Sequence, residues 1–406
     1  MLKYRTDIKS GNKLSIIGFG CMRFPRNLTQ IDINRTEQLV VKAVSEGVNY
    51  FDTAYTYGGS EEALGTILSK NNLRNKIFLA TKLPIGKCKT NHDFERLFQT
   101  QLERLHTDYI DYYLIHNIGD TAEWKRLCGL NIVKWIQEKK ESGQIKNIGF
   151  SFHGMHHEFI ELLDVYDWDF CQIQYNYINT NYQAGTAGLK KAAEKGLPVI
   201  IMEPLLGGKL ATGLPRKAVD TFRAANRSLS PAAWGLRWLW NHPEVTVVIS
   251  GMNEPAHLDD NFQTAKEAEP EILTAAENQA YDSVIKIIES TYKVPCTGCN
   301  YCMPCPHNVN IPACFTAYNL RYSVGLISGF TLYVTSTSLL NPLKTYAASN
   351  CKECGACEKK CPQHIPIVKS LKKVTQKMEP FWLSTVLKVV MKFTSSSRTP
   401  KIKDFE

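Results

Sequence analysis

The sequence predicts an α/β fold, a (β/α)8 TIM barrel followed by a mainly α-helical, cysteine-rich domain. Two observations lead to this prediction. Between residues 15 and 265, eight short apolar runs alternate with polar segments of helical period, as strands and helices do in a parallel sheet. Eight of the thirteen cysteines then fall in two tight groups near the C-terminus, where this alternation has ended.

Each predicted strand is a mostly apolar run of the kind that is buried in a parallel sheet. The eight runs are residues 15–20, 48–52, 77–82, 109–116, 145–151, 170–175, 198–203 and 245–250. Helices are expected between them, among others at residues 37–46, 94–105, 132–142 and 189–195, with stops at Gly47, Gly143 and Gly196. Eight strand–helix units close a barrel, and no GxGxxG follows the first strand, so a closed barrel is favoured over an open doubly wound sheet.

Composition divides the remaining chain. A Glu- and Ala-rich helical stretch at residues 269–290 should close the barrel domain, and dense Cys and Pro follow from residue 296. We therefore expect a barrel over residues 1–285, a cysteine-rich domain over 286–380 and a basic tail over 381–406. The segment 381–393 is apolar with interspersed lysines, and packing against protein is favoured there over a membrane surface.

Charge and cysteine usage restrict the compartment and the partners. The start of the chain has no apolar run of secretory type, and no stretch of about 20 apolar residues predicts a membrane span. Thirteen cysteines in such a chain indicate metal or redox chemistry, and we expect a cytoplasmic protein. The net charge of +9 comes entirely from the part after residue 290, which has 15 Lys/Arg against 5 Asp/Glu, whereas the rest has 33 against 34. No nucleic-acid motif accompanies it, so the basic part predicts no nucleic acid but is compatible with an acidic redox protein as partner.

Four ionisable residues converge on one rim of the predicted barrel. Asp52, Lys82 and His116 end the second, third and fourth strands, and Tyr57 lies in the loop after Asp52. Catalytic groups of such barrels stand at the carboxyl ends of the strands, which lie about 5 Å apart. The alternative is four separate local roles: a helix cap, a loop aromatic, a solvated lysine and a satisfied histidine.

The four residue types suit the reduction of a carbonyl. The carbonyl oxygen needs a proton as hydride reaches the carbon, and a free tyrosine, with a pKa near 10, is a poor acid at neutral pH. A cation at Lys82 would favour the phenolate of Tyr57 and lower that pKa, while Asp52 would hold the lysine. His116 could donate a hydrogen bond to the carbonyl oxygen.

Three segments resemble the aldo-keto reductase family. FDTAYTYGGSE (51–61), ATK (80–82) and LIH (114–116) are similar to the segments of its Asp–Tyr–Lys–His tetrad, and the match runs in order over roughly residues 1–265. The resemblance implies a nicotinamide-dependent oxidoreductase that converts a small carbonyl to an alcohol, or the reverse. Its catalytic residues would be Asp52, Tyr57, Lys82 and His116.

The resemblance also implies a site for NAD or NADP. IGFS (148–151) and CQIQYN (171–176) are similar to the segments that bind the carboxamide, IIMEPLLGGKL (200–210) to the pyrophosphate segment and VISGMNEPAHLDDN (248–261) to the adenosine segment. The implied contacts are Met22, Arg23, Asp52, Ser151, Gln172, Met202, Leu205, Gly207, Asn253, His257 and Asn261.

Some positions depart from the family pattern. Phe152 follows Ser151 where the family often has Asn, and Met202 replaces a stacking aromatic. Gly251 and His257 stand where NADPH-preferring relatives carry Lys and Arg, which predicts a preference for NADH. The alternative for Asn253, His257 and Asn261 is loop and helix-cap duty. A further group, His153, His156 and His157, lacks a Cys or carboxylate at ligand spacing and is predicted to be solvated.

The two cysteine groups indicate iron–sulfur clusters. CKECGACEKKCP (351–362) is the C-x2-C-x2-C-x3-C-P run of bacterial ferredoxins, and CTGCNYCMPCP (296–306) is one residue shorter before its last cysteine. In two-cluster ferredoxins the fourth cysteine of each run binds the other cluster. On this pattern, one 4Fe-4S cluster is bound by Cys296, Cys299, Cys302 and Cys361, and the other by Cys305, Cys351, Cys354 and Cys357. Zinc is the competing hypothesis, since two CxxC pairs can also bind a zinc ion through four thiolates. The five other cysteines are predicted to be buried thiols: Cys21, Cys88, Cys128, Cys171 and Cys314.

The whole chain resembles an aldo-keto reductase barrel fused to a dicluster ferredoxin-type domain. The clusters would either link the barrel to an external electron carrier or brace the C-terminal domain. Two alternatives to an enzyme remain: a cofactor-binding sensor and a partner-docking electron-transfer protein, each with little turnover of its own.

Overall fold

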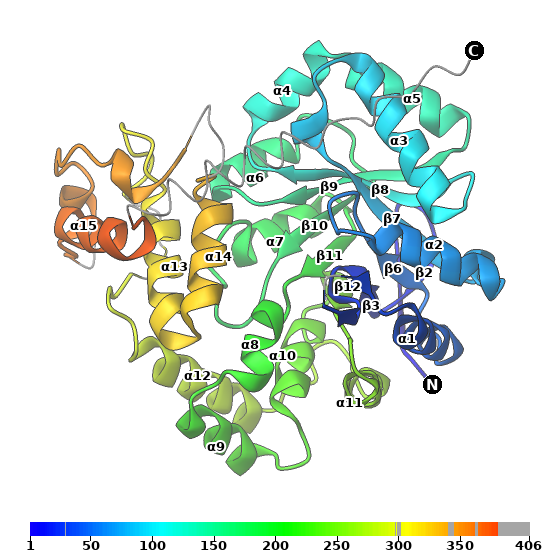
Figure 1. The fold of residues 1–406 in the computed structure, drawn as a ribbon. Helices are drawn as coiled ribbons and strands as arrows, with labels where there is room; N and C mark the ends of the chain where they lie inside the picture. The colour runs from blue at the N-terminus through cyan, green and yellow to red at the C-terminus, as the bar shows by residue number, and fades with distance from the viewer. Residues whose placement is uncertain (29, 297, 299–301, 340–344, 362–363, 381–406) are drawn as a thin grey trace. The chain divides into compact units, whose positions relative to one another are not determined.

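A closed barrel of eight parallel strands forms the first unit of the chain, Met1–Ser290 (Figure 1). The structure, a computed structural model, describes residues 1–28, 30–296, 298, 302–339, 345–361 and 364–380. The barrel strands are β3 (Ile17–Gly20), β6 (Tyr50–Asp52), β7 (Phe78–Leu83), β8 (Ile110–Ile118), β9 (Ile145–Phe152), β10 (Phe170–Gln174), β11 (Val199–Met202) and β12 (Val245–Ser250). Their order is β10-β11-β12-β3-β6-β7-β8-β9, so the predicted closed barrel is confirmed.

The first predicted strand is divided in the structure. Residues Lys13–Ser15 form β2, which pairs antiparallel with β1 (Tyr4–Thr6), and the barrel strand β3 begins only at Ile17. Ser15 turns the chain between them, because its hydroxyl donates to the carbonyl of Ile17. Leu14 belongs to the same buried apolar cluster as barrel-interior residues such as Tyr112. The β1–β2 hairpin therefore contributes to the interior core of the barrel.

Helices alternate with the barrel strands, as the periodicity predicts. They are α1 (Ile33–Ser45), α2 (Ser60–Lys70), α3 (Asn91–Leu105), α4 (Thr121–Gly129), α5 (Ile132–Glu141), α6 (His156–Leu162), α7 (Gly185–Glu194), α8 (Lys209–Thr212), α9 (Arg216–Ala225), α10 (Pro231–Trp240), α11 (Pro255–Lys266) and α12 (Ala275–Glu289). The predicted stops Gly47, Gly143 and Gly196 have φ of 102°, 74° and 70°. In this left-handed region a glycine ends a helix without strain, which confirms their role.

Two apolar clusters hold the barrel together. Inside it, Tyr112 packs edge-on against Tyr50 and Phe170, with ring centroids 5.3 Å and 5.1 Å apart. Outside, the other faces of the strands pack on the helices, as where Tyr113 meets Phe98 at 5.2 Å. This double burial explains why the strand sequences read as continuous apolar runs.

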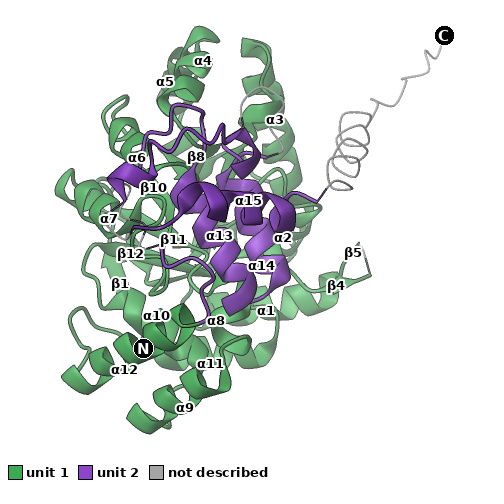
Figure 2. Ribbon diagram, turned by 90° about the vertical axis from the view of Figure 1, so that its left-hand side faces the viewer, with its two compact units in different colours: residues 1–290 green, residues 291–406 purple. Residues whose placement is uncertain are grey.

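The second unit, Thr291–Glu406, is helical where the structure describes it (purple in Figure 2). Its elements are α13 (Ile311–Ser323), α14 (Leu326–Ser336), η5 (Ala348–Asn350), η6 (Glu358–Lys360) and α15 (Ile367–Met378). Helix α13 packs against both α14 and α15. The mainly helical character predicted here is confirmed. The tail predicted at residues 381–406 lies outside the described residues.

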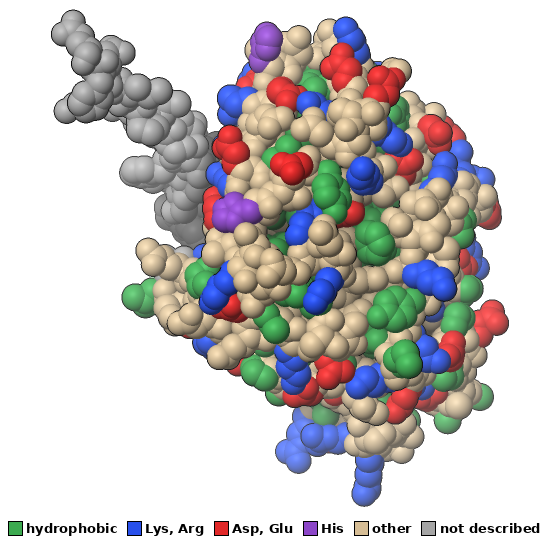
Figure 3. All heavy atoms as spheres, turned by 90° about the vertical axis from the view of Figure 1, so that its right-hand side faces the viewer, with side chains coloured by type: hydrophobic (Ala, Val, Ile, Leu, Met, Phe, Trp, Pro, Cys, Tyr) green, Lys and Arg blue, Asp and Glu red, His purple; other side chains and the backbone are tan. Residues whose placement is uncertain are grey.

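No helix among the described residues is long and apolar enough to span a membrane. On the face in Figure 3, acidic and basic side chains are intermixed with apolar ones. Ion pairs lie at the surface of the barrel unit, such as Lys42 with Asp259 and Lys70 with the partly buried Glu37.

Candidate active site and cluster-binding segment

The barrel brings the four predicted catalytic residues to one rim. Asp52 is the last residue of β6, Lys82 lies near the end of β7, and His116 lies near the end of β8. Tyr57 stands in the loop that leads into α2. Since β6, β7 and β8 are parallel neighbours, their carboxyl ends meet at the same end of the barrel.

Lys82 is the centre of this group. Its ammonium donates to Asp52 Oδ1 at 2.5 Å and to the carbonyl oxygen of Thr53 at 2.8 Å, and only 1% of the residue is exposed. The same Nζ lies 5.0 Å from the centre of the Tyr57 ring. His116 meets Tyr57 edge-on, with ring centroids 6.0 Å apart. A buried ammonium needs such partners, because an unpaired charge would be costly in the interior.

Burial and the neighbouring charges set the protonation states. Burial alone would lower the pKa of Lys82, but the Asp52 carboxylate and the Tyr57 hydroxyl outweigh it and raise that pKa, so the lysine is charged. Burial raises the pKa of Tyr57, and Lys82 only partly offsets this, so the phenol stays protonated. Lys82 therefore lowers the pKa of Tyr57, as predicted, but burial raises it by more, so the predicted lowering of this pKa is wrong. Burial, followed by repulsion from Lys82, lowers the pKa of His116 to about 3, so this ring is neutral.

The residues predicted to bind a nicotinamide lie beside the tetrad. Gln172 of β10 donates from Nε2 to Asp52 Oδ2 at 3.0 Å, and Ser151 of β9 accepts from the backbone N–H of Asn117 at 2.8 Å. Both residues are buried. Each keeps one further polar atom, Oε1 of Gln172 and the hydroxyl hydrogen of Ser151, which suits the two sides of a carboxamide.

Arg23 spans the loops that follow β11 and β12. A Cβ on Gly207 would lie 2.6 Å from Arg23 Nη2, and a Cβ on Gly251 would lie 3.1 Å from Arg23 Cδ. A side chain at either position would therefore have to displace the exposed arginine from this path. Its guanidinium lies at the segment that was matched to the pyrophosphate loop, so the residues present suit a dinucleotide.

The other predicted cofactor residues lie near the carboxyl ends of β3, β11 and β12 and on helix α11, and they differ in exposure. Met202 ends β11, and Leu205 precedes the short helix η4 (Leu206–Gly208). Asn261 is buried and donates to Ser250 at 3.0 Å, and exposed His257 bonds to Asn253 at 3.1 Å. Met22 is exposed, next to Arg23.

Of the three histidines predicted to be solvated, His153 and His156 are only partly exposed, and each bonds through one ring nitrogen. His153 Nδ1 lies 3.2 Å from Gln183 Nε2, and His156 Nδ1 bonds to the carbonyl of Ala184 at 2.9 Å. His157 is half-exposed, as predicted. The contact between His153 and Gln183 could not be predicted, because the two residues are 30 positions apart and give no local signal.

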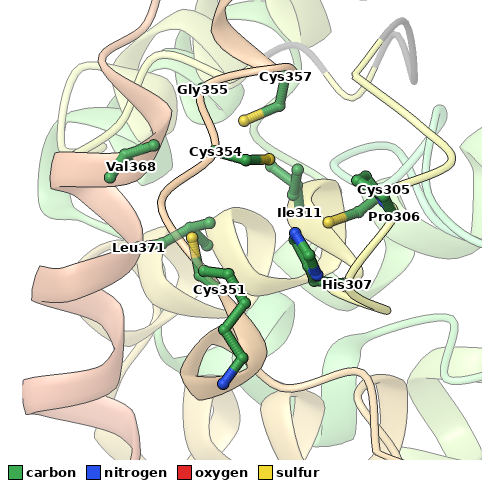
Figure 4. Close-up of a pocket in the computed structure, with 11 residues that line it drawn as sticks. Cys305, Pro306, His307, Ile311, Cys351, Cys354, Gly355, Cys357, Val368 and Leu371 are labelled. Carbon is green, nitrogen blue, oxygen red and sulfur yellow. The ribbon is translucent and has the colours of Figure 1, made fainter.

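Four of the predicted cluster cysteines line one cavity in the second unit (Figure 4). The cavity contains about 300 Å³ of space between atoms, part of it open to solvent. Its cysteines come from two distant segments: Cys305 from one, and Cys351, Cys354 and Cys357 from the other. The sequence assigned this same set to one cluster.

The ligands of the other predicted cluster are only partly described. Cys296, Cys302 and Cys361 are half-buried thiols, and Cys299 lies outside the described residues. Within the described ranges, no three His, Cys, Asp or Glu side chains are close enough together to hold one metal ion. A cubane binds each thiolate to a different iron, so its ligands stand farther apart than those of a single ion. Four cysteines around one cavity, with no three described ligands close enough for a single ion, therefore fit a cubane better than a zinc ion.

Comparison with known proteins agrees with both parts of the chain. The model of the "Aldo/keto reductase family" matches residues 16–285, and that of the "4Fe-4S dicluster domain" matches residues 295–365. Two solved structures share the barrel. One is the holo form of an aldo-keto reductase from Bacillus halodurans, with a TM-score of 0.57 and 24% identity over 70% of this chain and 96% of that one. The other is an aldo-keto reductase from Klebsiella pneumoniae in complex with NADPH, with a TM-score of 0.57, 23% identity and the same coverage.

Curated relatives are similar over the same region. The chain is 23% identical over 298 residues to "Aldo-keto reductase yakc [NADP(+)]" of Schizosaccharomyces pombe, covering 64% of this chain and 86% of that protein. It is 27% identical over 276 residues to "Methylglyoxal reductase YeaE" of Escherichia coli, covering 64% and 87%. Because the first family model spans well over half of its residues, the chain belongs to the aldo/keto reductase family, with a 4Fe-4S dicluster domain after the barrel.

Proposed function

We propose that the chain uses a nicotinamide cofactor to reduce a small carbonyl compound to an alcohol, or to catalyse the reverse, with Asp52, Tyr57, Lys82 and His116 as its catalytic residues. The position of Lys82 carries this proposal. Its buried ammonium lies between the Asp52 carboxylate and the Tyr57 ring, and His116 meets that ring edge-on.

Each residue has a separate task in this proposal. Tyr57 holds a proton at its hydroxyl and gives it to the carbonyl oxygen. Lys82 stabilises the phenolate that remains, and Asp52 holds Lys82 in position. Neutral His116 donates a hydrogen bond that orients the carbonyl oxygen. A bound reduced nicotinamide supplies the hydride.

The loops around the tetrad would hold the cofactor. Ser151 and Gln172 would bind the carboxamide, and Arg23 would bind the pyrophosphate where Gly207 and Gly251 make room for its side chain. Met202 would pack against the nicotinamide ring, because a thioether makes favourable contacts with aromatic rings. The remaining contacts would come from Met22, Asp52, Leu205, Asn253, His257 and Asn261.

The pH profile tests this assignment. Reduction needs Tyr57 protonated, and its pKa is raised, so kcat/KM should stay level between about pH 6 and pH 9 and fall only as the phenol ionises. His116, with a pKa of about 3, should add no acid limb in that range. The profile is measured as kcat/KM for reduction across a panel of aldehydes and ketones. An essential group with a pKa near 7 would contradict the assignment.

Replacement of Lys82 by Met tests whether Lys82 lowers the pKa of Tyr57. Lys82 lowers the pKa of Tyr57, so without it the alkaline limb should move to higher pH while the rate at neutral pH falls. A downward movement would show that another group titrates.

We propose that the residues around the adenosine end of the cofactor make the protein prefer NADH to NADPH. His257 is exposed and lacks the fork of donors with which an arginine binds a phosphate. We expect kcat/KM for NADH to exceed that for NADPH, and His257→Arg to shift the ratio toward NADPH by about tenfold, ~1.4 kcal/mol. His92→Arg on α3 is the matched control, since His92 is also exposed. A wild-type preference for NADPH would refute the proposal.

We propose two 4Fe-4S clusters in the second unit. One would be bound by Cys305, Cys351, Cys354 and Cys357, which line the same cavity. The other would be bound by Cys296, Cys299, Cys302 and Cys361, by the ferredoxin spacing. Such clusters and the free thiols of the barrel persist in a reducing compartment, which supports the proposed cytoplasmic location.

The first of these clusters would exchange electrons with an acidic redox protein. Cys354 is exposed, so the cluster edge would be open to a partner. Seven exposed lysines lie close to Cys354 in the sequence: Lys352, Lys359, Lys360, Lys369, Lys372, Lys373 and Lys377. Of these, Lys372 is paired with Glu353 at 2.7 Å. The positive field would steer an acidic carrier toward the cluster.

A further inference from the structure

A buried polar network lies behind the tetrad, where strand β7 meets helices α2 and α3 (Figure 1). Glu61, in the first turn of α2, accepts through Oε1 from the hydroxyl of Thr81 at 2.6 Å and from Gln101 Nε2 at 2.7 Å. Its Oε2 accepts from Arg104 Nη1 at 3.2 Å. Glu61 is 1% exposed, and a carboxylate buried to this degree needs such donors. The catalytic and cofactor roles proposed above use none of these four residues.

Gln101 connects the network to the backbone of the catalytic lysine. Its Nε2 also donates to the carbonyl oxygen of Lys82 at 3.1 Å, and its Oε1 accepts from the hydroxyl of Tyr113 at 2.7 Å. The N–H of Thr53, just past the end of β6, donates to the carbonyl oxygen of Ala80 at 2.9 Å. Carbonyls two residues apart in a strand point to the same side, so that of Lys82 points past the end of β6. The Gln101 side chain therefore takes the place of a strand partner there.

The ammonium of Lys82 is tied to the other end of the same network. Its Nζ donates to the carbonyl oxygen of Thr53 at 2.8 Å, and the Thr53 hydroxyl lies 2.9 Å from that of Ser60, the residue before Glu61. The N–H of Ser60 donates to the carbonyl oxygen of Tyr57 at 2.7 Å. The backbone and the ammonium of Lys82 are thus joined in a closed circuit that also holds the loop of Tyr57.

Close packing of α2 on α3 fixes the distance across this circuit. Gly65 lies one turn after Glu61 and faces the end of α3. A Cβ on Gly65 would lie 2.2 Å from the carbonyl oxygen of Arg104 and 2.7 Å from Cα of Leu105. Any side chain there would push the two helices apart, so the glycine is what lets Glu61 bond directly to Gln101 and Arg104.

We propose that Glu61 and Gln101 are positioning residues for the reaction: they hold the carboxyl end of β7 so that the Lys82 ammonium stays 5.0 Å from the centre of the Tyr57 ring. The effect of a charge on a neighbouring hydroxyl weakens as the charge moves away, so this separation matters for the acid. The inference rests on the proposed roles of Lys82 and Tyr57 and adds the residues that fix their separation.

Variants of the full chain test the proposal. Glu61→Leu removes the acceptor, so kcat for carbonyl reduction should fall about tenfold, while the dissociation constant of NADH should stay within about twofold. The alkaline limb of kcat/KM should move up by about one pH unit, because a more distant Lys82 lowers the pKa of Tyr57 less. Gln101→Met keeps the length of the side chain but loses the donor to the Lys82 carbonyl, and it should act in the same way.

The conservative variant should rescue both properties. Glu61→Gln keeps an oxygen that accepts from Thr81 and Gln101 and loses only the ion pair with Arg104. Its kcat should therefore lie within about threefold of wild type, with the alkaline limb in place. A limb that moves as far in Glu61→Gln as in Glu61→Leu would contradict the proposed role of these hydrogen bonds.

The chain offers a matched control for a loss of stability. Glu277 on α12 is also buried, and it pairs with Arg237 on α10 at 2.8 Å, away from β7. Glu277→Leu should lower Tm, as Glu61→Leu does, but leave the alkaline limb where it is. If Glu61→Leu lowers Tm and the amount of active enzyme without moving the limb, the network only stabilises the fold and the proposal is refuted.

A titration without turnover separates the positioning from the proposed reaction. The difference in ultraviolet absorption between a chain and its Tyr57→Phe variant reports the ionisation of this one phenol. Glu61→Leu and Gln101→Met should each raise its midpoint by about one pH unit. If no carbonyl is reduced but the midpoint rises, only the reaction is rejected. An unchanged midpoint in either folded variant rejects the positioning role.

Discussion

Replacement of Tyr57 by Phe should lower kcat for carbonyl reduction by about 10²- to 10⁴-fold, the usual contribution of a general acid. The substitution removes only the hydroxyl, so the ring keeps its edge-on contact with His116 and its position near Lys82. The nicotinamide contacts involve other residues, so the dissociation constant of NADH or NADPH should stay within about twofold. Steady-state kinetics and a fluorescence titration with the cofactor measure the two effects.

Tyr55 provides the matched control for this substitution. It stands in the same loop, and its ring lies under Arg104, whose Cζ is 4.4 Å from the ring centre. Tyr55→Phe removes an equivalent hydroxyl away from Lys82 and should leave kcat unchanged. Unchanged turnover in Tyr57→Phe would reject the assignment of Tyr57 as the acid.

The barrel and the tetrad could be predicted because their signals are local or periodic. Buried strands such as β7 and β12 appear as apolar runs, and the residues that end them must share a rim once the sheet closes. The predicted strand at residues 15–20 failed in part, because apolar character alone did not show that Ser15 turns the chain before Ile17.

The rest of the site depends on contacts between distant segments. Nothing local in the sequence indicates that Gln183 reaches His153, or that Glu203 adopts a left-handed backbone, which side chains other than Gly, Asn and Asp rarely take. Nothing local indicates either that Arg23 lies beside Gly207 and Gly251, which are distant from it in the chain. The sequence also could not show that the pKa of Tyr57 is raised, because the burial that raises it depends on the tertiary structure.

Removal of single cysteines should show which thiols share a cluster. If Cys305 completes the site of Cys351, Cys354 and Cys357, then Cys305→Ser and Cys351→Ser should each lose about four of about eight iron atoms per chain. The spacing before Cys305 is one residue short of the ferredoxin run, but the fold places its thiol on the cavity that the other three line. Iron and acid-labile sulfide analysis, with visible absorption, measure the loss in anaerobically purified protein.

The control and the double variant make this result decisive. Cys128→Ser, at a half-buried thiol on α4 of the barrel, should keep all the iron. Cys305→Ser combined with Cys351→Ser should lose no more than either alone, because both act on one cluster. Loss of about eight iron atoms in the double variant would place Cys305 on the other cluster, and zinc in place of iron would reject cubanes altogether.

The same variants decide whether the clusters carry electrons or brace the second unit. A cubane moves one electron at a time, whereas nicotinamide transfers a hydride, and no flavin motif is present in the sequence to convert one into the other. We therefore expect anaerobic NADH to leave the visible absorption of the clusters unbleached at catalytic rates, while a reduced acidic ferredoxin bleaches it in wild type. In Cys305→Ser the bleaching by ferredoxin should lose about half its amplitude, and carbonyl reduction with NADH should persist, because every group assigned to that reaction lies in the barrel. Bleaching by NADH alone would instead connect the tetrad's cofactor to the cysteines within one chain.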